Sequence, residues 1–549
     1  MKIPSIAGTL FLALLATACS KAPEPASVPG PPAAQPAADA TAAQKGAADS
    51  THANAEHGIA WQSGDVDAAF AKAKAEGKPL FLYWGAVWCP PCNEVKATIF
   101  NRQDFIERSR FFVPVYVDGD APSAQKLGAR FKVSAYPTMV LFTPDAKEIT
   151  RLPGEADADQ YMQVLALGMN GARPIKETLA AALAAGKAGG DAKVSPDDWR
   201  MLAYYSWETD EKQLADEGKL PDTLQRLAAA CPADQPELAT RLRLQAIAAA
   251  AKAKGAKPRD DKAAVGKLLP VLADPGLARE NFDVIVYYAD DIVGKSTLPG
   301  SPGRAELARI WNATLERLAT DKSFSDLDRL TALDAQVALA KLDGPKAKVP
   351  EALQQRIRDE AARVDRESRD PYVRQSLVST AAEVLADADL LDESDALLTS
   401  EVARSHSPYY AMLGLALNAK KRGDKAGAVD WAEKAYAAAK GPATRLQWGV
   451  RYVSLAIELT PQDAARIEHA AAEVIGELEP SPDTFYERNR RSLERMGKNL
   501  AAWNKDNRHA EAIRKLRAEM GGVCAKLPAA DPAHAVCEGT LRSAGAAKA

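Results

Sequence analysis

The sequence has no excess of charge of either sign, and it is poor in histidine. Its 549 residues include 70 Lys and Arg against 73 Asp and Glu, which gives a formal net charge of −3, and only six His. This balance gives no reason to expect nucleic acid as a partner. No two histidines have the spacing of a zinc-ligand pair, and a structural zinc ion needs four ligands. We therefore expect no metal site and no bound cofactor.

Long hydrophobic runs are also scarce. The stretch from Ile3 to Ala18 follows one basic residue and is too short for a stable membrane span, so it is typical of an export signal. It ends in LLATAC, which resembles a bacterial lipobox, although Ala16 stands where leucine is usual. Residues 1–19 are thus predicted as a lipoprotein signal peptide, with Cys19 carrying the lipid. The alternative is an ordinary cleaved signal with an incidental cysteine.

The segment after Cys19 is expected to be a tether. Ser20 resembles the residue found there in lipoproteins sorted to the outer membrane, so we expect a lipid anchor on the periplasmic face of that membrane rather than the inner one. Residues 20–56 are rich in Pro and Ala and show no apolar periodicity. Such a segment cannot bury enough surface to offset the entropy of ordering, which predicts a disordered linker.

Cysteine is scarce too, and export places the thiols in an oxidising compartment, where disulfides persist. Besides the predicted lipid site there are five. Cys89 and Cys92 form one pair by their spacing. Cys524 and Cys537 flank a segment with two prolines, and we predict a structural disulfide between them. Cys231 is left over and is expected to behave as a buried apolar residue.

Residues 57–172 show alternating strand and helix patterns. The apolar runs predict strands at 58–61, 79–84, 111–117, 138–142 and 148–152, and the helical patterns predict helices at 66–76, from Pro90 onward, at 122–131 and at 157–169. The last two strands are separated by a Pro-Asp-Ala turn, as in a hairpin. An α/β domain is therefore expected here.

The Cys-Pro-Pro-Cys sequence lies between a buried strand and the start of a helix. Cys89 directly precedes the helix N-terminus, where the helix dipole favours a thiolate, and Cys92 lies one turn inside. Three residues of separation place both sulfurs on the same face of the helix. An exposed, activated thiol beside a sheltered one is what thiol–disulfide exchange requires. A zinc site and a purely structural disulfide are the alternatives.

These elements resemble the thioredoxin fold. The resemblance rests on WCPPC at 88–92, on SAYPT at 134–138, and on the framing GIAW…AKAEGKPLFLYWGAVWCPPC, which is similar to the periplasmic domains of thiol:disulfide interchange proteins. It implies that Cys89 is the nucleophile and that Cys92 resolves the mixed disulfide. It also implies that Trp88, Tyr136 and Pro137 shape the substrate groove, with Pro137 in the position of the cis-proline that faces the dithiol.

One position departs from the family pattern. Many thioredoxins have a buried Asp six residues before the first cysteine, where it assists proton transfer at the resolving thiol, and this chain has Tyr83 there. Glu94 is a candidate substitute. A glutamate at a helix start is equally explained as a solvated residue that the helix dipole favours.

Residues 173–549 show helical patterns and little else. Ser-Pro or Thr-Pro followed by an acidic residue predicts helix starts at Ser195, Thr460 and Ser481. Pro408 and Pro442 are 34 residues apart, a spacing that weakly resembles tetratricopeptide repeats. Two interpretations stay open: a concave surface that docks a protein, and a scaffold with no specific ligand. The Gly and Pro near residue 172 predict a boundary beyond which the helical region folds independently.

The expected architecture is a thioredoxin-like α/β domain followed by a large all-α region. The function expected first is a membrane-tethered periplasmic thiol:disulfide oxidoreductase, of the reductase or isomerase type. Its substrates would be cysteine-containing envelope proteins, and a membrane-embedded disulfide reductant would supply electrons. The alternative is a cell-envelope interaction scaffold in which the thioredoxin-like domain is secondary.

Overall fold

The computed structural model describes most of the chain after the predicted tether. It covers residues 58–121, 123–133, 135–152, 158–171, 173–186, 193–210, 212–216, 218–344 and 346–542. These residues all belong to one compact unit, residues 50–549. The predicted signal peptide, Cys19 and the whole of the predicted tether lie outside the described residues. Within the described ranges, no helix combines the length and the apolar character that crossing a membrane requires.

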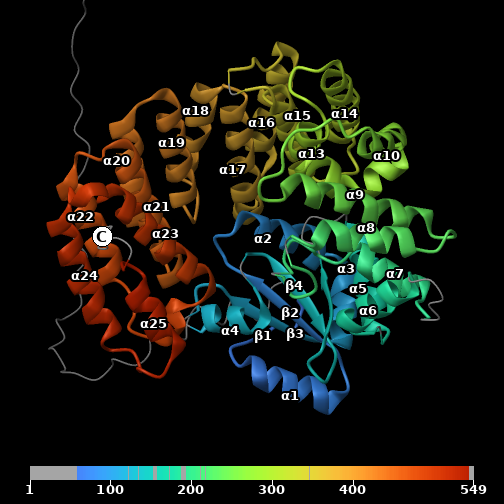
Figure 1. Ribbon diagram of the computed structural model, residues 1–549, viewed down its shortest axis with the longest axis horizontal. Coiled ribbons are helices and arrows are strands. Elements are labelled where there is room, and N and C mark those ends of the chain that lie inside the picture. The colour runs from blue at the N-terminus through green and yellow to red at the C-terminus, as the bar shows by residue number, and fades with distance from the viewer. Residues whose placement is uncertain are drawn as a thin grey trace, which may run out of the picture. The chain divides into compact units, whose positions relative to one another are not determined.

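A five-stranded mixed sheet forms the centre of the N-terminal part (Figure 1). The strand order is β1-β3-β2-β4-β5. β3 runs parallel to β1 and β2, whereas β4 runs antiparallel to β2 and β5. The strands are β1 (Gln62–Ser63), β2 (Leu80–Gly85), β3 (Val113–Asp118), β4 (Thr138–Phe142) and β5 (Glu148–Leu152). This sheet confirms the predicted α/β domain, including its hairpin.

Helices flank the sheet and follow the predicted order. They are α1 (Val66–Glu76), α2 (Pro90–Val95), the π-helical turn η2 (Lys96–Phe100), α3 (Gln103–Arg108), the 3-10 turn η3 (Ser109–Phe111), α4 (Ala124–Phe131) and α5 (Ala158–Met169). α1 has the predicted bounds because its ends are capped. Asp65 accepts hydrogen bonds from the backbone N–H groups of residues 67 and 68, and Gly77 ends the helix at φ 64°.

Several predicted boundaries are wrong by a few residues. β2 runs from Leu80 to Gly85 instead of over 79–84, and β3 ends at Asp118 instead of 117. The strand expected at 58–61 lies directly after that range, at Gln62–Ser63. β3 begins at Val113 instead of 111, because the preceding residues complete the η3 turn. The helix expected from residue 122 begins at Ala124. Each error is within the few residues by which short or frayed elements are usually misplaced.

The two faces of the sheet are both covered, which explains why β2 is apolar throughout. Leu80, Leu82 and Trp84 pack on the face that α1 and α4 cover. Phe81 and Tyr83 alternate with them and pack on the opposite face. All five side chains are at most 1% exposed. β2 is therefore packed on both faces, which fixes the position where the cysteine loop begins.

The rest of the described chain is helical apart from short turns and loops (Figure 1). Its elements are α6 (Ile175–Ala185), α7 (Pro196–Ala203), α8 (Leu220–Ala230), α9 (Pro236–Lys252), α10 (Lys262–Ala273), α11 (Pro275–Glu280), α12 (Phe282–Tyr287), α13 (Ala289–Ser296), α14 (Pro302–Thr320), α15 (Asp326–Ala340), α16 (Glu351–Glu367), α17 (Pro371–Asp387), α18 (Leu391–Val402), α19 (Tyr409–Arg422), α20 (Lys425–Ala438), α21 (Pro442–Leu459), α22 (Ala464–Gly476), η4 (Pro482–Phe485), α23 (Glu487–Trp503), η5 (Lys505–Asn507), α24 (Ala510–Cys524) and α25 (Pro532–Gly539). The prediction of an α/β domain followed by a helical region is confirmed.

Of the three predicted helix starts, one is confirmed. Ser195 caps α7 in a reciprocal capping box with Asp198. The Thr460 motif does not start a helix, because Asp463 caps α22 instead. The Ser481 motif opens only the short 3-10 helix η4. Consecutive helices pack against each other, as α17 with α18 and α19 with α20. The resemblance to tetratricopeptide repeats stays a prediction.

The hydrophobic core does not stop at the predicted boundary near residue 172. Phe81 and Leu141 of the sheet belong to the same buried cluster as Leu179 of α6 and Trp199 of α7. The side chain of Arg151 in β5 is fully buried and donates to the carbonyl oxygen of residue 209, at 2.8 Å. These shared contacts speak against independent folding of the helical region.

Candidate active site

The Cys-Pro-Pro-Cys segment is positioned by the end of β2 and the start of α2. Cys89 is the N-cap of α2, and Pro90 and Pro91 occupy the first two helical positions, where a missing N–H costs nothing. The first backbone N–H inside the helix therefore belongs to Cys92, and it donates to the Cys89 sulfur at 3.2 Å. The two cysteines are disulfide-bonded, with Cα atoms 5.2 Å apart. The structure thus describes the oxidised dithiol.

Cys89 is buried, contrary to the expectation of an exposed nucleophile. It is 3% exposed and Cys92 is 0% exposed. Both belong to the same hydrophobic cluster as Trp448 of α21 and Leu493 of α23. The sequence pattern of residues 80–95 predicts a surface site because it is local, and it contains no information on the distant helices that cover the site.

α17 holds the cysteine loop from one side. Gln375 donates from its amide nitrogen to the carbonyl oxygen of Trp88 at 2.8 Å and accepts from the Asn93 amide at 3.2 Å. Ser376 donates to the carbonyl oxygen of Pro90 at 2.8 Å. α17 lies beside α2 (Figure 1). Two of these hydrogen bonds therefore hold the backbone on both sides of Cys89, and the third holds the Asn93 side chain.

A buried carboxylate connects the loop to α21. The indole N–H of Trp88 donates to Asp120 at 2.6 Å, and the backbone N–H and hydroxyl of Thr444 donate to the same carboxyl at 2.8 and 2.9 Å. Burial raises the pKa of the Asp120 carboxyl, and the hydrogen bonds from Thr444 and Trp88 oppose this rise. Asp120 follows β3, whose carboxyl end meets that of the parallel strand β2 at one sheet edge. That topology is the one sequence signal that would have placed Asp120 near Cys89.

The predicted groove residues form part of an aromatic cluster. The Tyr136–Pro137 peptide bond is cis, and the Tyr136 ring lies 6.2 Å from the Trp88 ring. From the helical region, Tyr410 and Trp448 approach Trp88 at 6.1 and 5.9 Å between ring centroids. The structure thus brings Trp88 and the Pro137 loop together and adds two aromatic residues that no local motif indicated, while a role of these residues in a substrate groove stays a prediction.

The structure places both residues that bear on the proton route: Tyr83, at the position of the usual aspartate, and Glu94, the candidate substitute. Tyr83 packs in an aromatic cluster with Trp61 and Phe100, on the opposite side of β2 from Trp84. Glu94 is two residues from Cys92, so it projects from the other face of α2. Its partner is Ser325 at the start of α15. The proposal that Glu94 replaces the family's aspartate is therefore not supported.

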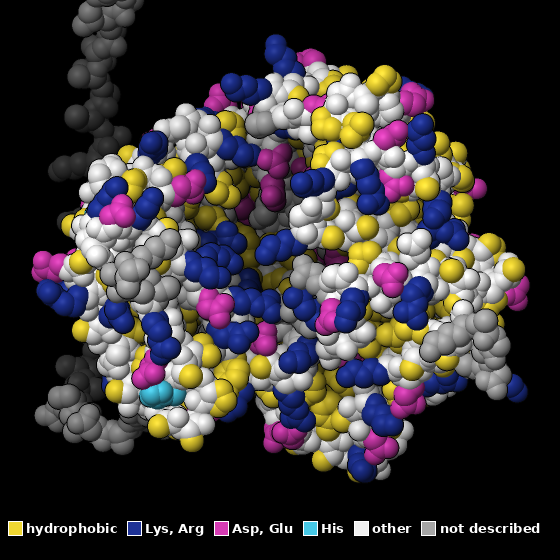
Figure 2. Space-filling model, viewed as in Figure 1, with side chains coloured by type: hydrophobic (Ala, Val, Ile, Leu, Met, Phe, Trp, Pro, Cys, Tyr) yellow, Lys and Arg dark blue, Asp and Glu magenta, His cyan; other side chains and the backbone are white. Residues whose placement is uncertain are grey.

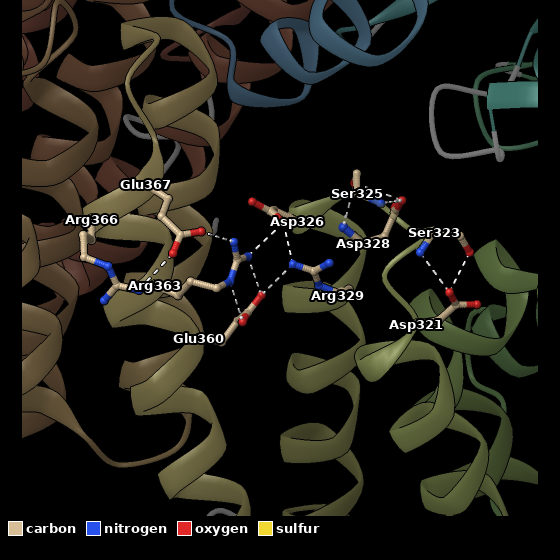
Figure 3. Close-up of polar contacts among 10 residues, drawn as sticks. All are labelled: Asp321, Ser323, Ser325, Asp326, Asp328, Arg329, Glu360, Arg363, Arg366 and Glu367. Atoms are coloured by element: carbon tan, nitrogen blue, oxygen red, sulfur yellow. Dashed lines mark hydrogen bonds and ion pairs between the residues drawn. The ribbon is translucent and has the colours of Figure 1, made fainter.

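Glu94 also differs from the solvated residue of the other interpretation. Burial and the nearby carboxylates of Asp328 and Asp326 raise the pKa of Glu94 to about 7, and the hydrogen bond with Ser325 opposes the rise. Figure 3 shows this end of α15, where Asp328 closes a capping box with Ser325 and Asp326 pairs with Arg329. An acidic side chain from α2 therefore packs against an acidic helix start.

The remaining cysteines lie elsewhere in the fold. Cys524 ends α24 and is disulfide-bonded to Cys537 of α25, with Cα atoms 5.6 Å apart and both side chains buried. This is the arrangement that the sequence predicts, and non-reducing peptide mapping of the protein remains its test. Cys231 is half-buried, and burial together with Asp234 raises the pKa of its thiol to about 11. Such a thiol is a poor nucleophile.

Comparison with known proteins agrees with this geometry. The family model of the thioredoxin-like domain matches residues 66–168. The thiol:disulfide interchange protein DsbD of Pseudomonas fluorescens is 28% identical over 103 residues, which is 18% of this chain and 18% of the relative. The thiol:disulfide interchange protein DsbD 2 of Pseudomonas aeruginosa is 27% identical over 125 residues, which is 22% of this chain and 21% of the relative.

A solved structure, DsbH oxidoreductase, is 20% identical and covers 20% of this chain and 85% of its own, with a TM-score of 0.19. The chain spans about a fifth of the length of the curated relatives it matches. The matched part contains the sheet, the cysteine loop and α2. Residues 66–168 form a thioredoxin-like domain, with the Cys89–Cys92 disulfide at the start of its α2 helix.

Proposed function

We propose that this chain is a thiol:disulfide oxidoreductase of the cell envelope that acts on cysteine-containing proteins. The observation that carries the proposal is the Cys89 sulfur at the N-cap of α2, bonded to Cys92 and receiving its N–H. A thiolate at this position is stabilised by the helix dipole and by one amide donor. The matching family model and the two interchange proteins support the same chemistry.

The exchange reaction needs only these two residues. The Cys89 thiolate displaces one sulfur of a substrate disulfide, and that sulfur leaves as a thiolate and takes up a proton. The Cys92 thiolate then displaces the other substrate sulfur from Cys89. The substrate has gained two electrons, and the chain has become the Cys89–Cys92 disulfide of the structure. A dithiol reductant, here a membrane-embedded one, returns the two electrons.

The reducing or isomerising direction follows from the residues between the cysteines. Pro90 and Pro91 offer no backbone N–H to the Cys89 sulfur and carry no charge. The thiolate is then less stabilised than in a strong oxidant, which makes the reduced form less favoured. Equilibration in glutathione buffers measures the potential. A value near that of the strongly oxidising periplasmic enzymes, about −120 mV, would leave an oxidase.

Anchoring through Cys19 completes the proposal. The lipobox-like end of the signal and the Pro- and Ala-rich segment after it support a periplasmic protein held at the outer membrane. Cys19→Ser is expected to leave an unprocessed precursor without a lipid label. Normal maturation with unchanged labelling would refute the anchor.

The burial of Cys89 favours a second candidate function. A disulfide enclosed by distant helices is also what a structural staple in an interaction scaffold would look like. Reduction of insulin by the intact protein separates the two. We expect turnover that Cys89→Ser abolishes and a trapped mixed disulfide with Cys92→Ser. Absence of turnover in the wild type, with Cys89 resistant to reductant under native conditions, would support the scaffold.

A further inference from the structure

Among the described residues, three arginines of the helices α21 and α23, which pack with the cysteine loop, have no carboxylate partner. Arg451 is on α21, and Arg488 and Arg495 are on α23. Across the described part of the chain, none of the three guanidinium groups forms an ion pair, whereas most arginines of the neighbouring helices do. Holding unpaired like charges near one another costs free energy, because they repel. A ligand of opposite charge would offset this cost.

The helical periodicity places these arginines on the faces that turn toward the site. On α21, Thr444, Trp448 and Arg451 recur at intervals of four and three residues, which is one face of a helix. Thr444 bonds Asp120 and Trp448 packs against Trp88, so this face looks onto the cysteine loop. Arg451 continues it by one turn.

On α23, Arg488 and Arg495 are seven residues apart and share a face. The Arg488 guanidinium lies 5.1 Å from the Trp88 ring centroid and 5.0 Å from that of Tyr136. The guanidinium of Arg488 therefore lies against Trp88, the residue that precedes Cys89 in the chain.

Arg488 and Arg495 lie close enough to act on the charge of Arg451. Loss of hydration and the like charges of Arg495 and Arg488 lower the pKa of Arg451. Arg451 and Arg495 are exposed, and Arg488 is half-buried. The acid that Arg488 influences is Asp120, which is already bonded by Trp88 and Thr444. Figure 2 shows Lys and Arg side chains gathered in the hollow beside the position of α23 in Figure 1.

We propose that Arg451, Arg488 and Arg495 form a cationic subsite that binds an acidic peptide segment of the substrate protein beside its reacting cysteine. This rests on the proposed function and adds a substrate class to it. Aspartate and glutamate side chains satisfy guanidinium groups with charge-assisted hydrogen bonds. A patch of one sign in a hollow also raises the local concentration of an oppositely charged ligand. The aromatic rings beside it supply the apolar contact surface.

The test is binding of a fluorescent peptide to the full-length protein, measured by anisotropy at low and at moderate salt. The peptide carries a serine in place of its cysteine, so binding is read independently of turnover. We compare an acidic sequence with neutral and basic versions of the same length. The wild type should bind the acidic peptide at least about tenfold more tightly than the neutral one, and added salt should reduce this preference.

The variant is R451Q/R495Q, which leaves Arg488 and its ring contacts intact. The matched control is R226Q/R517Q, because Arg226 on α8 and Arg517 on α24 are exposed arginines with no ion pair among the described residues. Only the first variant should lose the acidic preference, by about tenfold. Equal binding of all three peptides, an equal loss in both variants, or binding of anionic vesicles without the peptide would overturn the proposal.

Versions of these peptides that contain an intact disulfide test the subsite and the oxidoreductase activity separately. Selective binding without turnover would uphold the cationic subsite and refute the oxidoreductase. Turnover of acidic and neutral peptides at the same kcat/KM in wild type and R451Q/R495Q would uphold the oxidoreductase and refute the subsite.

Discussion

The disulfide-bonded cysteine pair at the start of α2 could be predicted from the sequence, whereas the residues that surround it could not. Cys89 and Cys92 are encoded by a local pattern, since an apolar strand, two prolines and a helix start together define the geometry of the sulfurs. Gln375 reaches the same loop from a point 287 residues away. Nothing in its own neighbourhood distinguishes it from any other glutamine of a helix.

Glu94 illustrates how tertiary packing changes the role of a residue. At a helix start a carboxylate is normally stabilised by the dipole. Here the pKa is raised to about 7 because α15 presents Asp328 and Asp326 to the same space. The sequence could not predict this, because the acidic residues lie more than 230 positions later.

We predict that Glu94→Gln stabilises the protein at alkaline pH. The folded pKa of about 7 lies above the ordinary value of 4.5. The stability that the protonated carboxyl contributes is therefore complete below pH 4.5 and is lost as the pH rises through 7. The variant should match the wild type near pH 4 and exceed its unfolding free energy by about 1–3 kcal/mol at pH 8.

Urea unfolding at the two pH values measures this difference. Glu519→Gln, at an exposed position of α24, controls for the general effect of removing a surface charge. A stabilisation by Glu94→Gln that is the same at pH 4 and pH 8 would show that Glu94 is not forced to ionise against its neighbours.

At the scale of elements, the boundaries of the α/β domain could be predicted well and those of the helical region poorly. α1, β4 and β5 have the predicted bounds because caps, a glycine stop and a tight turn mark their ends. In the alanine-rich region, helix starts depend on which of several polar residues provides the cap. Asp463 and not Thr460 begins α22, although both precede a helical pattern.

The packing of α17 on α2 is the element contact with the clearest functional consequence. Gln375 and Ser376 bond the backbone around Cys89, and the site is closed while they do so. A reductant must displace this contact to reach the disulfide. Gln375→Ala removes two hydrogen bonds, the one to the Trp88 carbonyl oxygen and the one from the Asn93 amide. We expect it to raise the rate at which dithiothreitol reduces Cys89–Cys92 by about fivefold or more, since lowering the opening cost by about 1 kcal/mol already gives roughly fivefold.

Alkylation of the released thiols followed by mass spectrometry measures the rate. Gln354→Ala is the control, because Gln354 also donates a side-chain hydrogen bond to a backbone carbonyl, at residue 388, away from the cysteine loop. A rate that is unchanged in Gln375→Ala, or equally raised in both variants, would mean that α17 does not control access.

At the scale of the whole molecule, the thioredoxin-like domain shares buried cores with the helical region in two places, at the sheet and at the cysteine loop. One buried cluster joins the sheet to α6 and α7, and another joins the cysteine loop to α21 and α23. α5 shows how closely the first is packed. A Cβ at Gly168 would lie 2.6 Å from Leu141 of β4, and Met201 of α7 is 3.7 Å from the same point.

This continuity leads to the last prediction. A fragment that begins at Pro174 would expose Leu179, Trp199 and Leu202, which the intact protein buries against the sheet side of the cluster. Exposing three large apolar side chains costs roughly 5 kcal/mol or more, a large share of a typical folding free energy. The fragment should therefore melt at a lower temperature than the intact protein, by circular dichroism, and bind a hydrophobic dye. The intact protein should show one transition for its sheet and its helices. A fragment that melts at the temperature of the intact protein without binding the dye would mean that the helical region has a sufficient core of its own, as the Gly and Pro near residue 172 indicate from sequence alone.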